Sequence, residues 1–163
     1  MGVTPMRLNK LLLGVLLVLS MALGTSTLHA QNTVDVTAGG SITVDRNHMI
    51  QAFLNVGRNA MQALGQSGRL IFRTRALTNF TVGGERHRLV LSAEVEDNGP
   101  GIPAELKETI FYPLVTGRPT GTGLGLTIAQ DLVSRNGGLI EFVSEPGRTV
   151  FQIRLPVVSG GRH

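Results

Sequence analysis

Pairs of adjacent glycines divide this sequence of 163 residues into segments as long as single strands and helices. Gly39-Gly40, Gly83-Gly84 and Gly137-Gly138 each separate two stretches in which apolar residues recur at regular spacing. Glycine adopts the positive φ angles of tight turns without a steric penalty, so such pairs mark chain reversals. We therefore expect one domain built from short strands and helices.

The residues around these glycines alternate between apolar and polar, as the two faces of a strand do. The alternation predicts strands or hairpins at 31–44, 70–78, 88–96, 139–144 and 149–155. Hairpins join some of these strands and helix-sized segments join others, so we expect a mixed sheet layered against helices. The predicted fold class is α/β (α+β), a two-layer sandwich.

Three segments have the spacing of amphipathic helices. The longest begins after Asp45, a favourable N-cap, and ends at Leu64. Shorter helices are expected at 103–110 and 124–135. The buried face expected for the long helix consists of Ile50, Phe53, Leu54, Met61 and Leu64.

Composition excludes several kinds of functional site. The chain has no cysteine, which excludes disulfides, thiolate nucleophiles and cysteine-ligated metals. Its four histidines lack the close spacing of zinc ligands. Aromatic residues make up 4% of the chain, too few for a stacking platform, and the net charge of +4 is no argument for nucleic acid. Five arginines alternate with apolar residues as on a solvated strand face: Arg69, Arg73, Arg75, Arg86 and Arg88.

The first thirty residues have the pattern of a targeting segment. Arg7 and Lys10 precede an apolar run from Leu11 to Gly24, and the small residue Ala30 follows at a possible cleavage point. The run is shorter than the ~20 residues of a spanning helix, which favours a signal peptide over a stable anchor. Residues 11–24 would reach a membrane only if they stay uncleaved.

Two asparagines lie on the predicted long helix, Asn55 and Asn59. Their spacing of four residues puts them on one helical face, opposite the expected apolar stripe. Asparagine is unfavourable in the middle of a helix, so two of them suggest a function. Their amide oxygens could face a hard cation such as Mg²⁺, which takes oxygen ligands together with substrate phosphates. A solvated helix face is the alternative.

A second motif, Asp97-Asn98-Gly99-Pro100-Gly101-Ile102, follows a predicted strand. The glycines permit a tight turn and allow a ligand to approach the backbone. Asp97 could accept a hydrogen bond from an exocyclic amine. The alternative is an ordinary turn between a strand and a helix.

A third motif, Gly121-Thr-Gly123-Leu-Gly125-Leu126, opens the last predicted helix. Backbone N–H groups at a helix N-terminus bind anions, and glycine lets a phosphate reach them. The motif lacks the Lys-Ser/Thr of a Walker A loop, and it follows a Pro/Gly loop and not the strand of a dinucleotide fingerprint.

The order of the motifs resembles a known family. N-x-x-x-N, D-N-G-P-G-I, F-Y-P-L and G-T-G-L-G-L are similar to the N, G1, F and G2 boxes of sensor histidine kinases, in the GHKL (Bergerat-fold) ATPase superfamily. The resemblance covers about residues 42–157 and is greatest to NtrB-type nitrogen-regulation kinases. It implies a histidine kinase domain that uses ATP and Mg²⁺.

The resemblance assigns roles to individual residues. Asn59 would coordinate Mg²⁺ and Asn55 would lie beside it, while Asp97 would bind the adenine amine. Residues 111–121 would form the lid over the nucleotide, with Arg118 and Arg58 as candidate phosphate contacts. The remaining ATP-binding residues that it implies are Gly99, Gly101, Ile102, Phe111, Gly121, Thr122, Gly123, Leu124 and Gly125.

Position 55 separates branches of the superfamily. Gyrase, MutL and Hsp90-type ATPases place a glutamate there to activate water, whereas asparagine cannot act as a general base. The resemblance therefore implies that ATP is presented for phosphoryl transfer, with Asn55 and Asn59 as the catalytic pair.

The resemblance also implies partners. The acceptor in the family is a histidine on a separate dimerisation domain, and no histidine here lies in an H-E-x-x-N-P-like context, so transfer would occur in trans. An NtrC-like response regulator and a PII-type regulator are the other expected partners. ATP use implies a cytoplasmic location, which conflicts with the export-like N-terminus.

The predicted organisation has four parts: a signal-like or anchor segment at 1–30, a linker or short strand at 31–41, the ATP-binding domain at 42–158 and a tail at 159–163. Two other functions remain open. One is a non-catalytic remnant that binds a nucleotide or a partner, and the other is an anti-sigma-type serine kinase.

Overall fold

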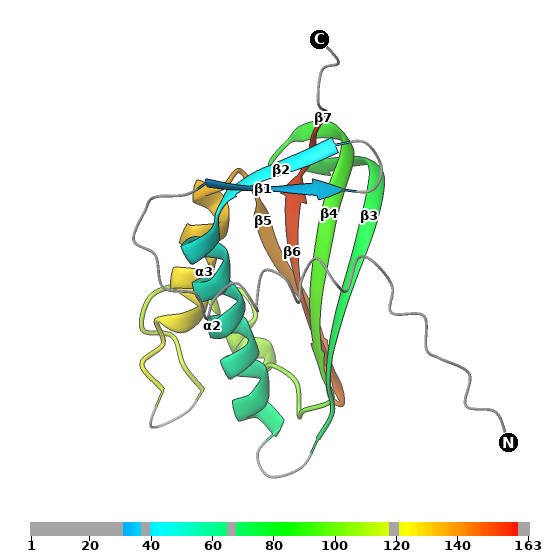
Figure 1. The fold of residues 1–163 in the computed structure, drawn as a ribbon. Helices are drawn as coiled ribbons and strands as arrows, with labels where there is room; N and C mark the ends of the chain where they lie inside the picture. The colour runs from blue at the N-terminus through cyan, green and yellow to red at the C-terminus, as the bar shows by residue number, and fades with distance from the viewer. Residues whose placement is uncertain (1–30, 37–39, 65–67, 118–120, 160–163) are drawn as a thin grey trace, which may run out of the picture.

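The computed structural model describes residues 31–36, 40–64, 68–117 and 121–159. Two helices pack against one face of a four-stranded sheet, and a three-stranded sheet lies across one end (Figure 1). The strand orders are β3-β4-β6-β5 and β1-β2-β7. The elements are β1 Gln31–Val36, β2 Gly40–Asp45, α2 Arg46–Leu64, β3 Leu70–Val82, β4 Glu85–Asp97, a 3₁₀ turn Ala104–Leu106, α3 Gly125–Arg135, β5 Leu139–Glu145, β6 Arg148–Pro156 and β7 Val158–Ser159.

The predicted two-layer α/β fold is confirmed, but the sheets are antiparallel in every described pairing. The chain leaves β4, passes through α3 and returns in β5, which runs parallel to β4. Strand β6 then folds back between these two strands and pairs with both. The expected mixed sheet does not form because the β5–β6 hairpin separates the only two strands that a helical crossover makes parallel.

Glycines with positive φ angles form the turns of the two hairpins in the four-stranded sheet. Gly83 and Gly84 have φ angles of +58° and +87° and join β3 to β4, which are longer than the expected strands. Strands β5 and β6 turn at Pro146-Gly147, where Gly147 has a φ of +85°. The strands expected at 31–44 are β1 and β2, and the turn expected between them lies outside the described residues.

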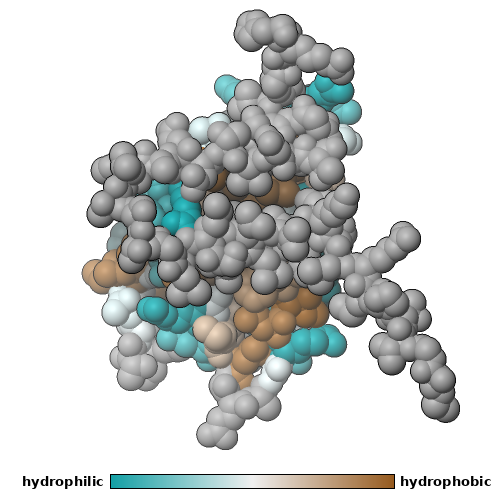
Figure 2. Space-filling model, viewed as in Figure 1, coloured by the Kyte–Doolittle hydropathy of each residue, from teal (hydrophilic) through white to brown (hydrophobic). Residues whose placement is uncertain are grey.

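Helix α2 has the expected length, but its expected apolar face is only partly covered: Ile50, Phe53 and Leu64 are half-buried. Its buried residues are small or flexible: Met49, Ala52, Val56, Gly57 and Ala60. Leu54 and Met61, which we expected in the core, are 58% and 57% exposed. The helix contacts both α3 and the sheet, and small residues let it approach two neighbours closely. Apolar residues appear at the surface in the lower part of the view in Figure 2, where α2 lies beside the sheet.

The start of α2 is fixed to the end of α3 by hydrogen bonds. Asp45 caps α2 as expected, since its Oδ1 accepts the N–H of His48 at 3.0 Å. The Asp45 N–H donates to Oδ1 of Asn136, the C-cap of α3, at 2.7 Å. The Nδ2 of Asn136 lies 3.3 Å from Nδ1 of His48 and donates to the Leu132 carbonyl at 2.7 Å. These contacts hold the two helices in one orientation.

The segment at 103–110 is not the helix that we expected. It forms a single 3₁₀ turn at Ala104–Leu106, followed by further turns. The Nζ of Lys107 donates to the Ser144 carbonyl at 2.7 Å and ties the segment to the end of β5. No residue of the 3₁₀ turn is buried, so tertiary packing does not stabilise a longer helix at this position.

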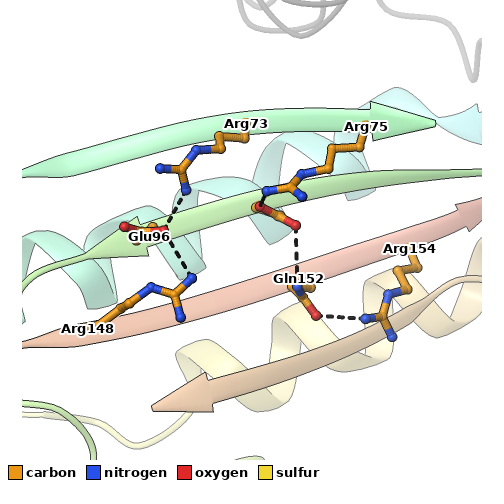
Figure 3. Close-up of polar contacts among 7 residues, drawn as sticks. Arg73, Arg75, Glu96, Arg148, Gln152 and Arg154 are labelled. Carbon is orange, nitrogen blue, oxygen red and sulfur yellow. Dashed lines mark hydrogen bonds and ion pairs between the residues drawn. The ribbon is translucent and has the colours of Figure 1, made fainter. Parts of the chain in front are cut away.

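The sheet face turned away from the helices carries a network of charges (Figure 3). Glu96 pairs with Arg73 at 2.5 Å and with Arg148 at 3.5 Å. The hydrogen bond from Arg73, and secondarily the positive charges of Arg73, Arg148 and Arg69, hold the pKa of Glu96 below its usual range. Of the five arginines predicted on a solvated strand face, Arg73 and Arg75 form ion pairs with Glu96 and Glu94. The other three, Arg69, Arg86 and Arg88, are exposed, as expected.

No helix among the described residues is long and apolar enough to span a membrane. The predicted targeting segment at 1–30 and the predicted anchor run at 11–24 lie outside these residues.

Candidate functional site

Asn55 and Asn59 lie half-buried on α2, at the side facing the start of α3. A Cβ built on Gly125, the first residue of α3, would lie 4.0 Å from the Cβ of Asn55. The Nδ2 of Asn55 is buried and has no hydrogen-bond partner among the described residues. A buried amide without a partner is costly, so this atom indicates a place for a polar ligand.

Asp97 ends β4 and is 2% exposed. Its Oδ1 accepts the N–H of Gly99 at 2.9 Å, which fixes the carboxylate at the start of the loop. The register of β4 and β6 places Thr149 directly opposite Asp97. Residues that face each other across an antiparallel pair share one face of the sheet, so the Thr149 hydroxyl belongs to the same site as the carboxylate.

Sequence reasoning did not identify Thr149 as a site residue. It stands 52 positions from Asp97 in the sequence, and only the β4–β6 register brings the two together. The sequence signal nearest to Thr149 is the Glu145-Pro146-Gly147 turn, which places Thr149 near the beginning of a strand.

The two glycines of the D-N-G-P-G-I loop are in close contact with their surroundings. A Cβ on Gly99 would lie 3.2 Å from Ala63 of α2, and one on Gly101 would lie 2.8 Å from the Glu145 carbonyl oxygen. Gly101 also has a φ of +86°, which disfavours other residues. The loop therefore fits between α2 and the β5–β6 hairpin, and the Gly147 N–H donates to the Gly99 carbonyl at 2.9 Å.

Ile102 connects the end of this loop to the same hairpin. Its backbone N–H donates to the Ser144 hydroxyl at 2.8 Å, and the Ser144 Oγ lies 2.9 Å from the Thr149 Oγ1. Ser144 and Thr149 are 8% and 4% exposed. The loop, the hairpin and the hydroxyl facing Asp97 thus form one connected unit.

The expected lid begins at Phe111, which is half-buried and belongs to an aromatic cluster. Its ring meets the rings of Phe142 and Phe151 edge-on, at centroid distances of 5.9 and 6.5 Å. Thr127 of α3 donates its hydroxyl to the Phe111 carbonyl at 3.0 Å. These contacts anchor the first residue of the lid to the sheet and to α3.

The two sides of the lid meet at Leu114 and Gly123. The Leu114 N–H donates to the Gly123 carbonyl at 3.0 Å, and a Cβ on Gly123 would come within 2.5 Å of the Leu114 backbone. Gly123 has a φ of +65°. Gly121 and Thr122 lie just before it and are exposed, and the Leu124 N–H is 3.5 Å from the Thr122 hydroxyl.

The structure brings two of the predicted motifs to α2, the helix that carries Asn55 and Asn59. A Cβ on Gly99 would lie 3.2 Å from Ala63 and one on Gly125 would lie 4.0 Å from Asn55, so the Asp97 loop and the glycine motif both adjoin this helix. Arg58 is exposed on the helix that carries Asn59, and Arg118 lies outside the described residues. The contacts of individual residues with a nucleotide stay predictions.

The arrangement suits a nucleoside triphosphate. Asp97 is a buried acceptor at one end, and the N-terminus of α3 offers backbone N–H groups beside Asn55 at the other. Among the described residues, no three His, Cys, Asp or Glu side chains form a metal cluster.

Comparisons with known proteins agree with this geometry. Residues 30–159 match the family described as histidine kinase-, DNA gyrase B- and HSP90-like ATPases. The chain is 52% identical over 114 residues to the sensory histidine kinase/phosphatase NtrB of Escherichia coli O157:H7, covering 69% of this chain and 33% of that protein. NtrB of Vibrio alginolyticus is 44% identical over 119 residues, covering 72% and 34%. The chain thus spans about a third of the length of these relatives.

Solved structures give the same result. The catalytic domain of histidine kinase ThkA matches with a TM-score of 0.60 at 29% identity, covering 75% of this chain and 74% of that one. The mycobacterial sensor histidine kinase MprB matches with a TM-score of 0.57 at 26% identity, covering 74% and 77%. The chain belongs to the family of histidine kinase-, DNA gyrase B- and HSP90-like ATPases, and its domain is of the ATP-binding kind found in NtrB-like histidine kinases.

Proposed function

We propose that this domain binds Mg-ATP and presents the γ-phosphate for transfer to a histidine on a separate helical domain. The observation that carries the proposal is the unpartnered buried amide of Asn55 facing Gly125 at the N-terminus of α3. An amide N–H beside a helix N-terminus donates a hydrogen bond to phosphate oxygens, in addition to the bonds from the backbone N–H groups.

Asp97 binds the base in this proposal. Its carboxylate is an acceptor only, so it selects a ligand with an amine donor, such as the 6-amino group of adenine. Burial strengthens this hydrogen bond because water does not compete with it. Gly99 keeps a side chain out of the space next to the carboxylate, since a Cβ there would lie 2.8 Å from Asp97 Oδ1.

Asn59 holds magnesium through its amide oxygen, and the metal would neutralise charge on the transferred phosphoryl group. Asn55 has no basic group, so it cannot activate water for hydrolysis. The γ-phosphoryl group therefore stays available for an acceptor imidazole, whose nitrogen forms the new P–N bond as ADP leaves.

The surface beside the lid is suited to the acceptor domain. Tyr112 and Leu114 are 61% and 74% exposed, and Leu124 and Ile128 on the adjoining segment are 40% and 37% exposed. Large exposed apolar residues next to a transfer site are expected where a partner docks. By family, the further partners would be an NtrC-like response regulator and a PII-type regulator, and the site of action would be the cytoplasm.

Calorimetric titration of the chain with ATP and ADP, with and without Mg²⁺, tests binding. We expect Mg²⁺-dependent ATP binding that Asp97→Asn weakens by at least about tenfold, because a charge-assisted hydrogen bond contributes about 1.5–3 kcal/mol. Asn98→Ala, an exposed neighbour whose Oδ1 accepts the Arg69 N–H, is the matched control.

Labelled ATP and a purified acceptor domain from an NtrB-like kinase test transfer. The proposal predicts label on the acceptor histidine in the presence of this chain and Mg²⁺. ATP binding without transfer would favour a non-catalytic remnant. Absence of nucleotide binding by the folded protein would contradict the proposal.

A further inference from the structure

In the part of the chain that the structure describes, the helix layer leaves β3 largely uncovered. Helix α2 packs against β4 and α3 against β5, whereas β3 forms the edge of the sheet beyond β4. Phe72 of β3 is on the side of the sheet that faces the helices, because its ring lies 3.9 Å from the position that a Cβ on Gly57 of α2 would take. It is nevertheless 46% exposed. Ala76, four residues further along the same strand face, is exposed as well.

The side of α2 next to β3 carries an apolar row. Its members follow one another at spacings of four and three residues, which keeps them on one face of the helix. They are Ile50, Leu54, Gly57, Met61 and Leu64. Two of them, Leu54 and Met61, are 58% and 57% exposed. The row is on a different side of α2 from Asn55, which faces Gly125 of α3.

The exposed members of this row and of β3 form one surface, which we call the β3 shelf: Leu54, Met61, Phe72 and Ala76. Apolar residues are visible at the surface where α2 lies beside the sheet (Figure 2). Large apolar side chains that are exposed side by side mark a docking surface. The alternating spacing of four and three residues on α2 is the spacing against which a second helix packs its own apolar side chains. The shelf therefore fits a helix.

The charges beside the shelf are positive. Helix α2 contains two arginines and no acidic residue. Arg58 is exposed one turn along the helix from Leu54. Arg46 lies one turn before Ile50, and its Nε and Nη2 are buried without a hydrogen-bond partner among the described residues. A guanidinium that lacks acceptors in a partly buried place is costly, so a carboxylate brought close to it is stabilising.

These charges distinguish between three occupants of the shelf. A second copy of the chain would place α2 against another α2 and bring arginines together without any acidic residue between them. Residues 1–30 contain Arg7 and Lys10 and no acidic residue, so the apolar run at 11–24 brings no negative charge either. A helix of another protein, with an apolar stripe flanked by Glu or Asp, complements both the apolar row and the arginines.

We propose that the β3 shelf is a docking site for an acidic amphipathic helix of another protein. Its apolar stripe packs on Leu54, Met61 and Phe72, and its acidic residues face Arg46 and Arg58. The bound helix lies beside α2 and extends the helix layer over the edge of the sheet. This docking does not depend on nucleotide binding, because the shelf is on a different side of α2 from Asn55.

A synthetic helical peptide of about three heptads tests the proposal on the full chain, since α2 has 19 residues. The peptide carries leucine at the a and d positions, glutamate at e and g and a fluorescent label. A second peptide carries lysine in place of glutamate. We expect fluorescence anisotropy to show binding of the glutamate peptide, and binding of the lysine peptide that is weaker by at least about tenfold. Equal binding of the two peptides, or binding of neither, would overturn the proposal.

Met61→Glu tests the apolar half of the surface. It should weaken binding of the glutamate peptide by about tenfold or more, because it removes an apolar contact and adds a like charge. Val143→Glu is the matched control, since Val143 is also 57% exposed but lies on β5 at the opposite edge of the sheet. An equal loss in both variants would contradict the assignment to the shelf. Should Met61→Glu not fold, Leu54→Glu decides the matter.

Arg58→Glu tests the charged half. It should remove the preference for the glutamate peptide over the lysine peptide, whereas Arg88→Glu should keep it. Arg88 is exposed on β4, outside the shelf, and its variant changes the net charge of the protein by the same amount. Retention of the preference in Arg58→Glu would refute the role of charge.

The other two occupants give different results. Self-association of the wild-type chain in sedimentation that Met61→Glu abolishes would assign the shelf to a second copy. Peptide binding that appears only after Leu17→Glu, inside the apolar run, would assign it to residues 11–24. Either result would overturn the proposal.

Discussion

Asn55 and Gly125 face each other across the two helices, with 4.0 Å between the Cβ of Asn55 and the position that a Cβ on Gly125 would take. The Asn55 Nδ2 is buried at this junction and has no partner among the described residues. The helices therefore meet at a polar group that the protein itself does not satisfy. Such a group lowers the stability of the free protein and raises the affinity for a ligand that can accept its hydrogen bond.

The first prediction concerns the unpartnered amide of Asn55. Asn55→Ala should raise the stability of the nucleotide-free protein by about 1 kcal/mol, because it removes an unpaired donor and places a better helix former inside α2. The same change should weaken ATP binding by about tenfold. Thermal unfolding and calorimetry on one preparation measure both effects.

Gln51→Ala serves as the control, since Gln51 is exposed one turn earlier on α2. It should change neither the melting temperature nor the affinity appreciably. A fall in the stability of Asn55→Ala would show that the amide is satisfied in solution, contrary to the prediction.

The second prediction concerns the junction of the lid. Gly123→Ala should destabilise the protein by more than the roughly 1–2 kcal/mol of a positive φ angle, because the new Cβ would also collide with the Leu114 backbone at 2.5 Å. Gly83→Ala has a similar φ of +58° and open space around the position. The difference between the two variants in denaturant unfolding isolates the collision, and equal losses would refute it.

The third prediction tests the aromatic anchor of the lid. Phe111→Ala should cost about 2–4 kcal/mol, since it removes a half-buried ring that packs edge-on against Phe142 and Phe151. Val143→Ala on β5 is the control, because Val143 is 57% exposed and should change stability little. Hydrogen exchange at residues 111–117 should accelerate in Phe111→Ala alone, and unchanged exchange there would mean that the ring does not hold the lid.

The fourth prediction concerns acid. The Arg73 hydrogen bond lowers the pKa of Glu96 in the folded protein, so its stabilising contribution is present above the ordinary value of 4.5 and is lost as the pH falls through the lowered pKa. Glu96→Gln should reduce the melting temperature at pH 7 and make it less sensitive to acid below pH 4.5. Glu105→Gln, at an exposed carboxylate, should keep the wild-type slope. An identical acid profile for Glu96→Gln would contradict the prediction.

Local chemistry made several features predictable. Asp45 is an N-cap because its side chain satisfies a backbone N–H at a helix start, and Gly83-Gly84 turns because both residues need positive φ. The proximity of Asn55 to the glycine motif was expected from the resemblance of the motif order, and the Gly125 contact agrees with that expectation.

Other features depend on partners that lie far away in the sequence. Leu54 and Met61 satisfy the periodicity of a buried stripe, but α2 packs against two elements at once and uses its small residues to do so. Thr149 became a site residue only through the β4–β6 register. The insertion of β6 between β4 and β5 could not be inferred from strand patterns, because alternation does not specify which strand is the neighbour.

The central position of β6 has a consequence for the nascent chain. Asp97 ends β4 and Thr149 begins β6, so a ribosome must add about fifty more residues after the carboxylate before the facing hydroxyl exists. Until then β4 has β3 on one side and an open edge on the other, which is the arrangement most prone to pairing with a wrong chain. The proposed base site is thus one of the last parts of the domain that the growing polypeptide completes.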